Sequence, residues 1–235
     1  MRKLLRKCFL LFYRIYALRV ISRDSICNYK QVTVKVPKGV FHPGLFFSSI
    51  LLIEEWERRP LNGKSFLELG CGSGLISIIA AKNGAITTAI DINSEAVRIT
   101  EDNAKSNEVD VEVLQSDLFS ALPKRKFDII AINPPYYKKN PVDHSGAAWY
   151  AGENLEYFQK LFLQIEEHTH ANSIVLMVVS EDVSWKDVVK LAAQQNITFS
   201  LACEKVICFE KNFIYELIFN ANSTNTTLLK NLRKS

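Results

Sequence analysis

The stretch SFLELGCGSGLISIIAAKN, residues 65–83, decides the fold of this chain of 235 residues. Its first five residues are mainly apolar, which is typical of a buried strand. A loop with three glycines follows, and the apolar residues after this loop have helical spacing. The sequence therefore predicts a strand, a glycine loop and a helix, an order that lets a ligand approach the backbone closely at the helix N-terminus.

Strands and helices alternate on both sides of this stretch. Further strands are predicted at 31–36, 85–92, 111–117, 127–132 and 173–180, and further helices at 44–59, 94–107 (with Ser94 as N-cap), 153–168 and 185–195. Such alternation predicts a parallel sheet with helices on both faces. The strand-like runs 198–209 and 212–220 are joined only by Glu210 and Lys211, so they must pair as a hairpin with the last strand antiparallel.

The positive charge of the chain is concentrated at its N-terminus. The formal net charge is +4, and seven basic residues but no acidic one precede Asp24. The apolar run CFLLFY there is too short for a signal peptide or a membrane span, and it predicts an amphipathic helix instead. This helix either docks on the domain, recruits an anionic substrate such as RNA, or attaches to a membrane surface.

The remaining composition indicates one domain with two extensions. We expect a basic helix and a strand in residues 1–38, the main domain in 39–222 and a flexible tail in 223–235, because the last residues are rich in Ser, Thr and Asn. The five cysteines form no CxxC pair or metal-type cluster, which indicates reduced thiols in a cytoplasmic protein and no metal site.

Acidic residues follow or end three of the predicted strands. Asp91 ends the strand after the glycine loop, at the distance expected for an acid that binds ribose hydroxyls. Asp117 ends the next strand and could accept a hydrogen bond from an adenine amino group, while Glu68 could meet a cationic end of the ligand. The glycines match the dinucleotide pattern poorly, because the third comes one residue early. The ligand implied is a nucleoside with a positive group, and an NAD-dependent reductase is disfavoured.

This order of motifs resembles the class I S-adenosylmethionine-dependent methyltransferases. The resemblance implies a Rossmann-like sheet of seven strands, mostly parallel with an antiparallel last strand, and S-adenosyl-L-methionine as cofactor. It assigns the cofactor to Glu68, Gly70, Gly72, Gly74, Asp91, Ile92, Asp117, Leu118 and Asn133.

The motif Asn-Pro-Pro-Tyr at 133–136 follows the strand 127–132. Within that superfamily it marks enzymes that methylate a planar nitrogen of an amide or an exocyclic amine. The Asn133 oxygen and the Pro134 carbonyl can accept two N–H bonds and orient such a nitrogen. Pro135 stiffens the loop, and Tyr136 offers a flat face for stacking. These four residues are the predicted catalytic group.

The segment after this motif indicates the substrate. Residues 145–162 resemble the HemK-type release-factor glutamine methyltransferases, most closely the short archaeal and eukaryotic branch, through Ala148, Trp149, Ala151, Gly152 and Asn154. Residues 39–52 resemble the segment that precedes the glycine loop in that branch, although His42-Pro43-Gly44 replaces a more acidic stretch. The resemblance places Phe41, Pro43, Tyr136 and Trp149 at the substrate.

The substrate stays open between two nitrogen types. One is a protein glutamine, in a release factor or ribosomal protein; the other is adenine N6 or guanine N2 in RNA or DNA, which the basic N-terminus favours. A small partner subunit is compatible with either substrate. A non-catalytic module that binds S-adenosylmethionine, or only a partner, is a further alternative that Asn133 and Tyr136 disfavour.

Overall fold

A computed structural model describes residues 16–17, 19–45, 47–140, 148–181, 183–207 and 210–220. Residues 1–15, where the N-terminal helix is predicted, and the predicted tail, residues 223–235, lie outside these ranges. The described elements, in chain order, are β1 (Ser25–Tyr29), β2 (Val32–Val36), α2 (Ser48–Trp56), β3 (Ser65–Leu69), α3 (Leu75–Lys82), β4 (Ile86–Asp91), α4 (Ser94–Ser106), β5 (Val111–Gln115), β6 (Ile129–Ile132), α5 (Glu156–Gln164), the 3₁₀ helix η2 (Ile165–His168), β7 (Ile174–Ser180), α6 (Trp185–Ala193), β8 (Ile197–Ile207) and β9 (Glu210–Phe219).

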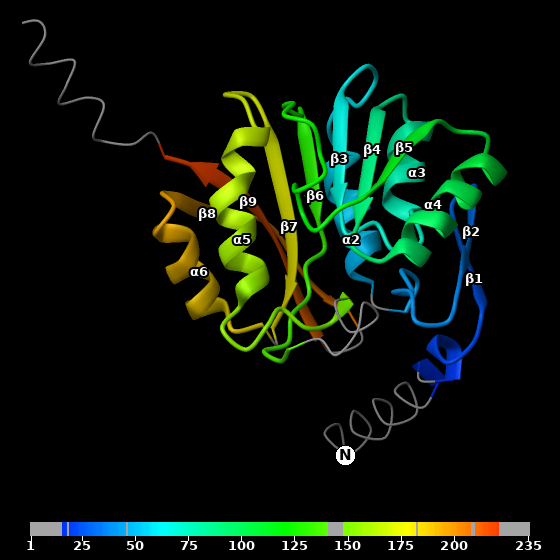
Figure 1. Ribbon diagram of the computed structural model, residues 1–235, viewed down its shortest axis with the longest axis horizontal. Coiled ribbons are helices and arrows are strands. Elements are labelled where there is room, and N and C mark those ends of the chain that lie inside the picture. Colours follow the sequence, from blue (N-terminus) through cyan, green and yellow to red (C-terminus); the bar gives the residue numbers. More distant parts are fainter. Residues whose placement is uncertain are drawn as a thin grey trace, which may run out of the picture.

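Seven of these strands form one sheet in the order β5-β4-β3-β6-β7-β9-β8 (Figure 1). Strands β3 to β7 pair in parallel, and β9 runs antiparallel to both β7 and β8. The expected α/β fold with an antiparallel last strand is thereby confirmed. The connecting turn differs from the prediction, because Glu210 and Lys211 belong to β9.

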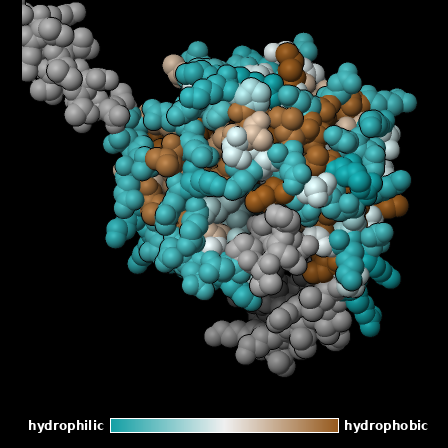
Figure 2. All heavy atoms as spheres, in the orientation of Figure 1, coloured by the Kyte–Doolittle hydropathy of each residue, from teal (hydrophilic) through white to brown (hydrophobic). Residues whose placement is uncertain are grey.

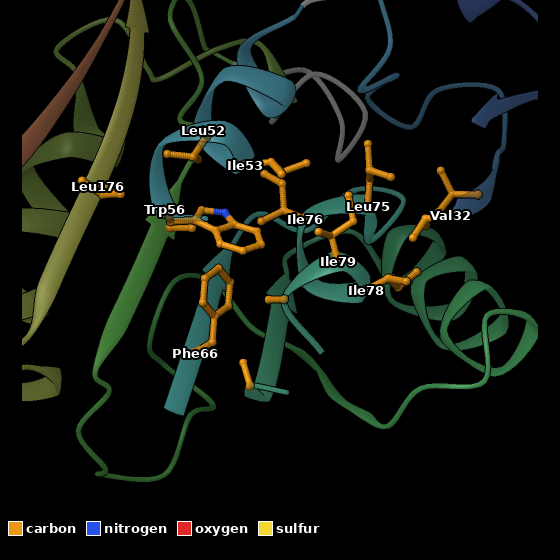
Figure 3. Close-up of a cluster of buried hydrophobic side chains, with 14 of the residues drawn as sticks. Val32, Leu52, Ile53, Trp56, Phe66, Leu75, Ile76, Ile78, Ile79 and Leu176 are labelled. Carbon is orange, nitrogen blue, oxygen red and sulfur yellow. The ribbon is translucent and has the colours of Figure 1, made fainter. Parts of the chain in front are cut away.

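Apolar side chains fill both faces of the sheet, because the central strands are apolar at every second residue on each side. Phe66 of β3 lies in one buried cluster and its neighbour Leu67 lies in the other. Figure 3 shows the first cluster, where the rings of Trp56 and Phe66 pack edge to face with centroids 5.4 Å apart. Residues of α2 and α3 cover this face, while those of α5 and α6 cover the other.

The hairpin of β1 and β2 forms a second, two-stranded sheet. Only its second strand was predicted, since β1 has a polar and irregular sequence. Asn103 of α4 and Asn107, the C-cap of this helix, hold the backbone of β2. Asn103 accepts from the Lys35 amide (2.9 Å) and donates to its carbonyl (2.8 Å), and Asn107 does the same at Thr33 (3.2 and 2.8 Å). The two side-chain amides thus replace a third strand along this edge.

The start of α4 also differs from the prediction. The N-cap is Asn93, whose side-chain oxygen accepts a hydrogen bond from the Glu95 amide at 3.0 Å, whereas Ser94 is the first helical residue.

Hydrophilic residues cover much of the face seen in Figure 2. Within the described residues, no helix is long and apolar enough to cross a membrane.

Candidate active site

A cavity of about 410 Å³ opens where the carboxyl ends of β3, β4, β5 and β6 meet. Open α/β sheets bind ligands at this edge, because loops and helix N-termini converge there. The predicted site residues that line the cavity are Phe41, Gly70, Gly72, Asp91, Ile92, Asp117, Leu118, Asn133, Pro134, Pro135, Tyr136 and Trp149. Three other predicted residues, Glu68, Gly74 and Pro43, are not among those that line it.

The glycine loop turns back over the end of β4. The amide of Gly72 donates to a carboxylate oxygen of Asp91 at 2.9 Å, and the Asn93 amide donates to the other oxygen at 2.9 Å. These bonds fix the Asp91 carboxylate at the cavity wall while each oxygen keeps acceptor capacity. The carboxylate can therefore accept hydrogen bonds from the hydroxyls of a bound ribose.

Gly74 has a packing role in this structure. Its φ is +81°, and a Cβ at this position would lie 2.7 Å from Cγ2 of Thr100 on α4. A side chain here would therefore force α3 and α4 apart. The glycine permits this close approach at the start of α3, beside the cavity but outside its lining.

Glu68 also has a structural role in this fold. Its side chain is buried and accepts hydrogen bonds from the amide (2.9 Å) and the hydroxyl of Ser77, in the first turn of α3. Desolvation raises the pKa of Glu68 to about 8. The carboxyl group thus caps a helix beneath the glycine loop and is not among the residues that line the cavity, and its contact with the cationic end of a ligand stays a prediction.

Asp117 lies two residues beyond the end of β5 and lines the cavity. Its carboxylate forms an ion pair with Lys160 of α5, which lines the same cavity. Ile92 and Leu118 also line the cavity and provide apolar walls. Such walls suit the flat ring of a base, and the carboxylate beside them can accept from its amino group.

Asn133 follows β6 directly, and its side-chain amide is held from two directions. The amide nitrogen donates to the hydroxyls of Ser48 (3.1 Å) and Ser49 (3.3 Å) at the start of α2. The amide oxygen accepts from the Tyr136 hydroxyl at 2.8 Å. Desolvation raises the pKa of the Tyr136 hydroxyl, so it stays a donor at neutral pH. The serines were missed because nothing in their local sequence distinguishes them from ordinary helix-start residues.

The Pro-Pro loop is clamped by the segment around Trp149. Both the Tyr136 and the Tyr137 amides donate to the Trp149 carbonyl, at 3.2 and 2.9 Å, and the Ala151 amide donates to the Tyr137 carbonyl at 2.9 Å. The Trp149 ring contacts that of Phe41, with centroids 5.4 Å apart and planes tilted by 50°. Phe41 and Trp149, both predicted at the substrate, therefore form an aromatic wall beside Asn133, whereas Pro43 is buried and lies outside the lining.

Residues 148–152 line the cavity ahead of the turn into α5. Gly152 has φ +90°, and a Cβ there would lie 1.8 Å from Oε2 of Glu156. The Glu156 carboxylate accepts from the amide (3.0 Å) and the side-chain nitrogen (2.9 Å) of Asn154. Gly152 and Asn154 thus shape the turn into α5. In the described part of the chain, no group of His, Cys, Asp and Glu side chains is suited to hold a metal ion.

The comparisons with known proteins agree with this geometry. The family model "Methyltransferase small domain" matches residues 31–189. A Methanocaldococcus jannaschii protein provisionally named a protein N5-glutamine methyltransferase is 39% identical over 112 residues, which are 47% of this chain and 54% of that protein. The ribosomal protein L11 methyltransferase of Thermotoga maritima is 35% identical over 112 residues, 47% of this chain and 42% of that protein. The chain thus spans about half the length of these curated relatives.

Two solved structures share the fold. The Thermus thermophilus 16S rRNA N2-guanine methyltransferase RsmC, in complex with AdoMet and guanosine, has a TM-score of 0.63 at 21% identity, over 83% of this chain and 50% of that one. The E. cuniculi Mtq2–Trm112 complex, which methylates the termination factor eRF1, has a TM-score of 0.59 at 17% identity, over 77% of this chain and 99% of that one. Because the family model matches more than half of the residues, the chain belongs to the methyltransferase small domain family.

Proposed function

We propose that the chain is an S-adenosylmethionine-dependent N-methyltransferase whose acceptor is the side-chain amide of a protein glutamine. One observation carries the proposal. Asn133 and Pro134 line the same cavity as Gly70 and Gly72 of the glycine loop, and the Asn133 amide oxygen accepts from the Tyr136 hydroxyl at 2.8 Å.

The glycine-loop side suits the methyl donor. Gly70 and Gly72 would let the backbone approach the ligand closely, Asp91 would accept from its ribose hydroxyls, and Asp117 would accept from its adenine amino group, with Ile92 and Leu118 as apolar lining. When bound, S-adenosylmethionine supplies an electrophilic methyl group on a sulfonium sulfur.

The Asn133 side suits a planar nitrogen. An amide nitrogen is a weak nucleophile, so holding it in line with the methyl group is the main task of the protein. The Asn133 oxygen and the Pro134 carbonyl accept its two N–H bonds and stabilise the positive charge that develops on the nitrogen. Tyr136 and the wall of Phe41 and Trp149 hold the flat amide between them. Water takes the proton afterwards, because the alkylated nitrogen is strongly acidic.

The charges around the opening favour a protein acceptor over a nucleic acid. Lys138 pairs with Asp187 and Lys160 with Asp117. The basic run 124–126 precedes β6, at the opposite edge of the sheet, where Arg125 pairs with Glu112 and Lys124 with Glu167 (3.4 Å). Phosphate binding draws on cations that are available to the backbone of the nucleic acid, and these side chains are already matched by carboxylates.

A base of RNA or DNA is the second candidate acceptor. Tyr137 is exposed beside the opening, and the Lys139 ammonium lies 5.1 Å from the centre of the Tyr150 ring. Exposed aromatic rings with lysines nearby can stack unpaired bases. The basic residues before Asp24 would add phosphate contacts to this interpretation.

The proposed glutamine acceptor implies a protein substrate that carries it. A release factor or a ribosomal protein would present the glutamine, since the compared proteins are named for the termination factor eRF1 and for ribosomal protein L11. A small partner subunit is also part of this proposal, since the structural neighbour Mtq2 was solved in complex with Trm112.

The test supplies purified protein and tritiated S-adenosylmethionine to a cell lysate, with Asn133→Ala as the matched control. Aliquots are then treated with protease, RNase or DNase. We expect label that only protease removes, and that strong acid releases as volatile methylamine, because hydrolysis of an N-methylated amide yields this amine. Label that a nuclease removes and that stays on a base after hydrolysis would contradict the glutamine assignment.

A further inference from the structure

Two serines contact the proposed catalytic asparagine, although the proposed chemistry has no step for them. Ser48 and Ser49 are the first two residues of α2, and their exposed fractions are only 2% and 4%. Both hydroxyl oxygens lie within hydrogen-bond distance of the Asn133 amide nitrogen, at 3.1 and 3.3 Å. An NH₂ group has two hydrogens, so the pair of serines satisfies both donors of this amide.

The opposite side of the same amide faces the reaction. A carboxamide oxygen has two lone pairs, and the Tyr136 hydroxyl uses one of them at 2.8 Å. The second lone pair is the acceptor that the proposed mechanism needs. If the Asn133 amide turned over, its NH₂ group would occupy this position. It would then face the N–H groups of the substrate nitrogen, and two hydrogen-bond donors cannot bond to each other.

We infer that Ser48 and Ser49 are positioning residues that hold the Asn133 amide with its oxygen toward the acceptor nitrogen. This inference rests on the proposed function. The serines act on Asn133, and Ser48 also interacts with the Tyr136 hydroxyl that bonds the same amide. Neither serine contacts substrate or cofactor in the mechanism. Their own position is firm, because α2 packs through its buried residues Leu52, Ile53 and Trp56 onto the sheet (Figure 3).

The kinetic test compares Ser48→Ala, Ser49→Ala and the double variant in the wild-type and Asn133→Ala backgrounds. The acceptor is the lysate fraction that the wild-type protein labels. We expect the double variant to lower kcat about tenfold, the size expected when a buried donor loses its partner, with the KM for S-adenosylmethionine unchanged. In the Asn133→Ala background the same substitutions should have no further effect. An equal tenfold loss in both backgrounds would overturn the inference.

Ser173→Ala is the matched control. Its hydroxyl donates to the Phe127 carbonyl at 2.6 Å and accepts from the His170 amide at 2.7 Å, before β7 at the other edge of the sheet. This variant loses a bonded hydroxyl without touching the cavity. We expect its kcat to stay within twofold of the wild type.

A second measurement needs no acceptor, so it separates this inference from the proposed function. In protein labelled with ¹⁵N-asparagine, the Asn133 side-chain signal is identified by its loss in Asn133→Ala. Its two protons should exchange slowly with water in the wild type and at least tenfold faster in the double serine variant. Unchanged exchange would overturn the inference even if methylation is confirmed. Faster exchange in a protein that methylates no glutamine would leave the positioning intact and reject only the proposed function.

Discussion

The two halves of the cavity are built in different ways. The glycine-loop half, at the ends of β3, β4 and β5, consists of strand–loop–helix units that are continuous in the sequence. The Asn133 half brings together residues 41, 48–49, 133–136 and 148–152, which are far apart in the chain. A site built from a continuous segment can be recognised as a motif in the sequence. A site assembled from distant segments cannot, because tertiary packing decides which residues meet. The first half should therefore govern binding of the donor, and the second half should govern the chemical step.

The largest expected effect tests the Asn133 half. Asn133→Ala should lower kcat by about 10²- to 10³-fold, the usual cost of one orienting group in a polar site. The Kd for S-adenosylmethionine, measured by calorimetry, should change less than threefold. A comparable loss of cofactor affinity would show that the two halves are not separable in this way.

The next prediction concerns stability of the glycine-loop half against pH. The pKa of Glu68 is raised to about 8 by burial, while an unfolded glutamate titrates near 4.5. The stabilisation from the protonated Glu68 is therefore complete below pH 4.5 and is lost as the pH rises toward 8. Each pH unit in this window should lower the free energy of unfolding by roughly 1 kcal/mol.

Glu68→Gln should remove this pH dependence, because the amide does not titrate. Denaturant unfolding at pH 4.5 and pH 8 measures the difference, with Glu101→Gln on the exposed face of α4 as control. A wild type whose stability does not fall relative to Glu68→Gln between these values would show that the folded glutamate ionises normally.

A smaller effect is expected for the contact between Asp91 and S-adenosylmethionine. Asp91→Ala should raise the Kd for S-adenosylmethionine about 10- to 100-fold, as hydrogen bonds to a charged group are worth roughly 1.5–3 kcal/mol. Asp110→Ala, an exposed acid just before β5, should leave the Kd unchanged. If Asp91→Ala lowers kcat while keeping the Kd, the assignment of the two halves is reversed.

The smallest expected effect separates packing from backbone conformation. Gly74 and Gly63 both have left-handed φ, +81° and +72°, but only a Cβ at Gly74 meets Thr100, since nothing lies within 4 Å at Gly63. Gly74→Ala should therefore lower the free energy of unfolding by about 1–2 kcal/mol more than Gly63→Ala. Thr100→Ala combined with Gly74→Ala should recover part of this loss, and equal costs at both glycines would contradict the steric explanation.

The sequence predicted the local units better than the contacts between them. The strands and helices from β2 to β9 follow from apolar periodicity, and the antiparallel end follows from the short connection between β8 and β9. Strand β1 was missed because its pairing to β2 compensates for a polar sequence. The cap of α4 was misplaced by one residue because Asn93 and Ser94 both suit an N-cap.

In the site, too, the sequence predicted the positions of residues along the chain but not the contacts of their side chains. Spacing along the chain brought Asp91, Asp117 and Asn133 to the correct edge of the sheet, and each lines the cavity. Spacing does not give side-chain direction, so it did not reveal that Glu68 points beneath the loop toward Ser77. It also did not reveal Ser48 and Ser49, whose contact with Asn133 spans more than 80 residues.

The asparagines that hold β2 have a consequence for shortening the chain. Asn103 binds the backbone of Lys35 and also donates to the carbonyl of Ser73 in the glycine loop, at 2.9 Å. If the chain were trimmed to start at residue 39, the side chains of Asn103 and Asn107 would lose their hydrogen-bond partners on β2. Asn103 would then be held less firmly, and so would the glycine loop that it bonds. A deletion away from the cavity should therefore weaken binding of S-adenosylmethionine through a residue that does not line the cavity.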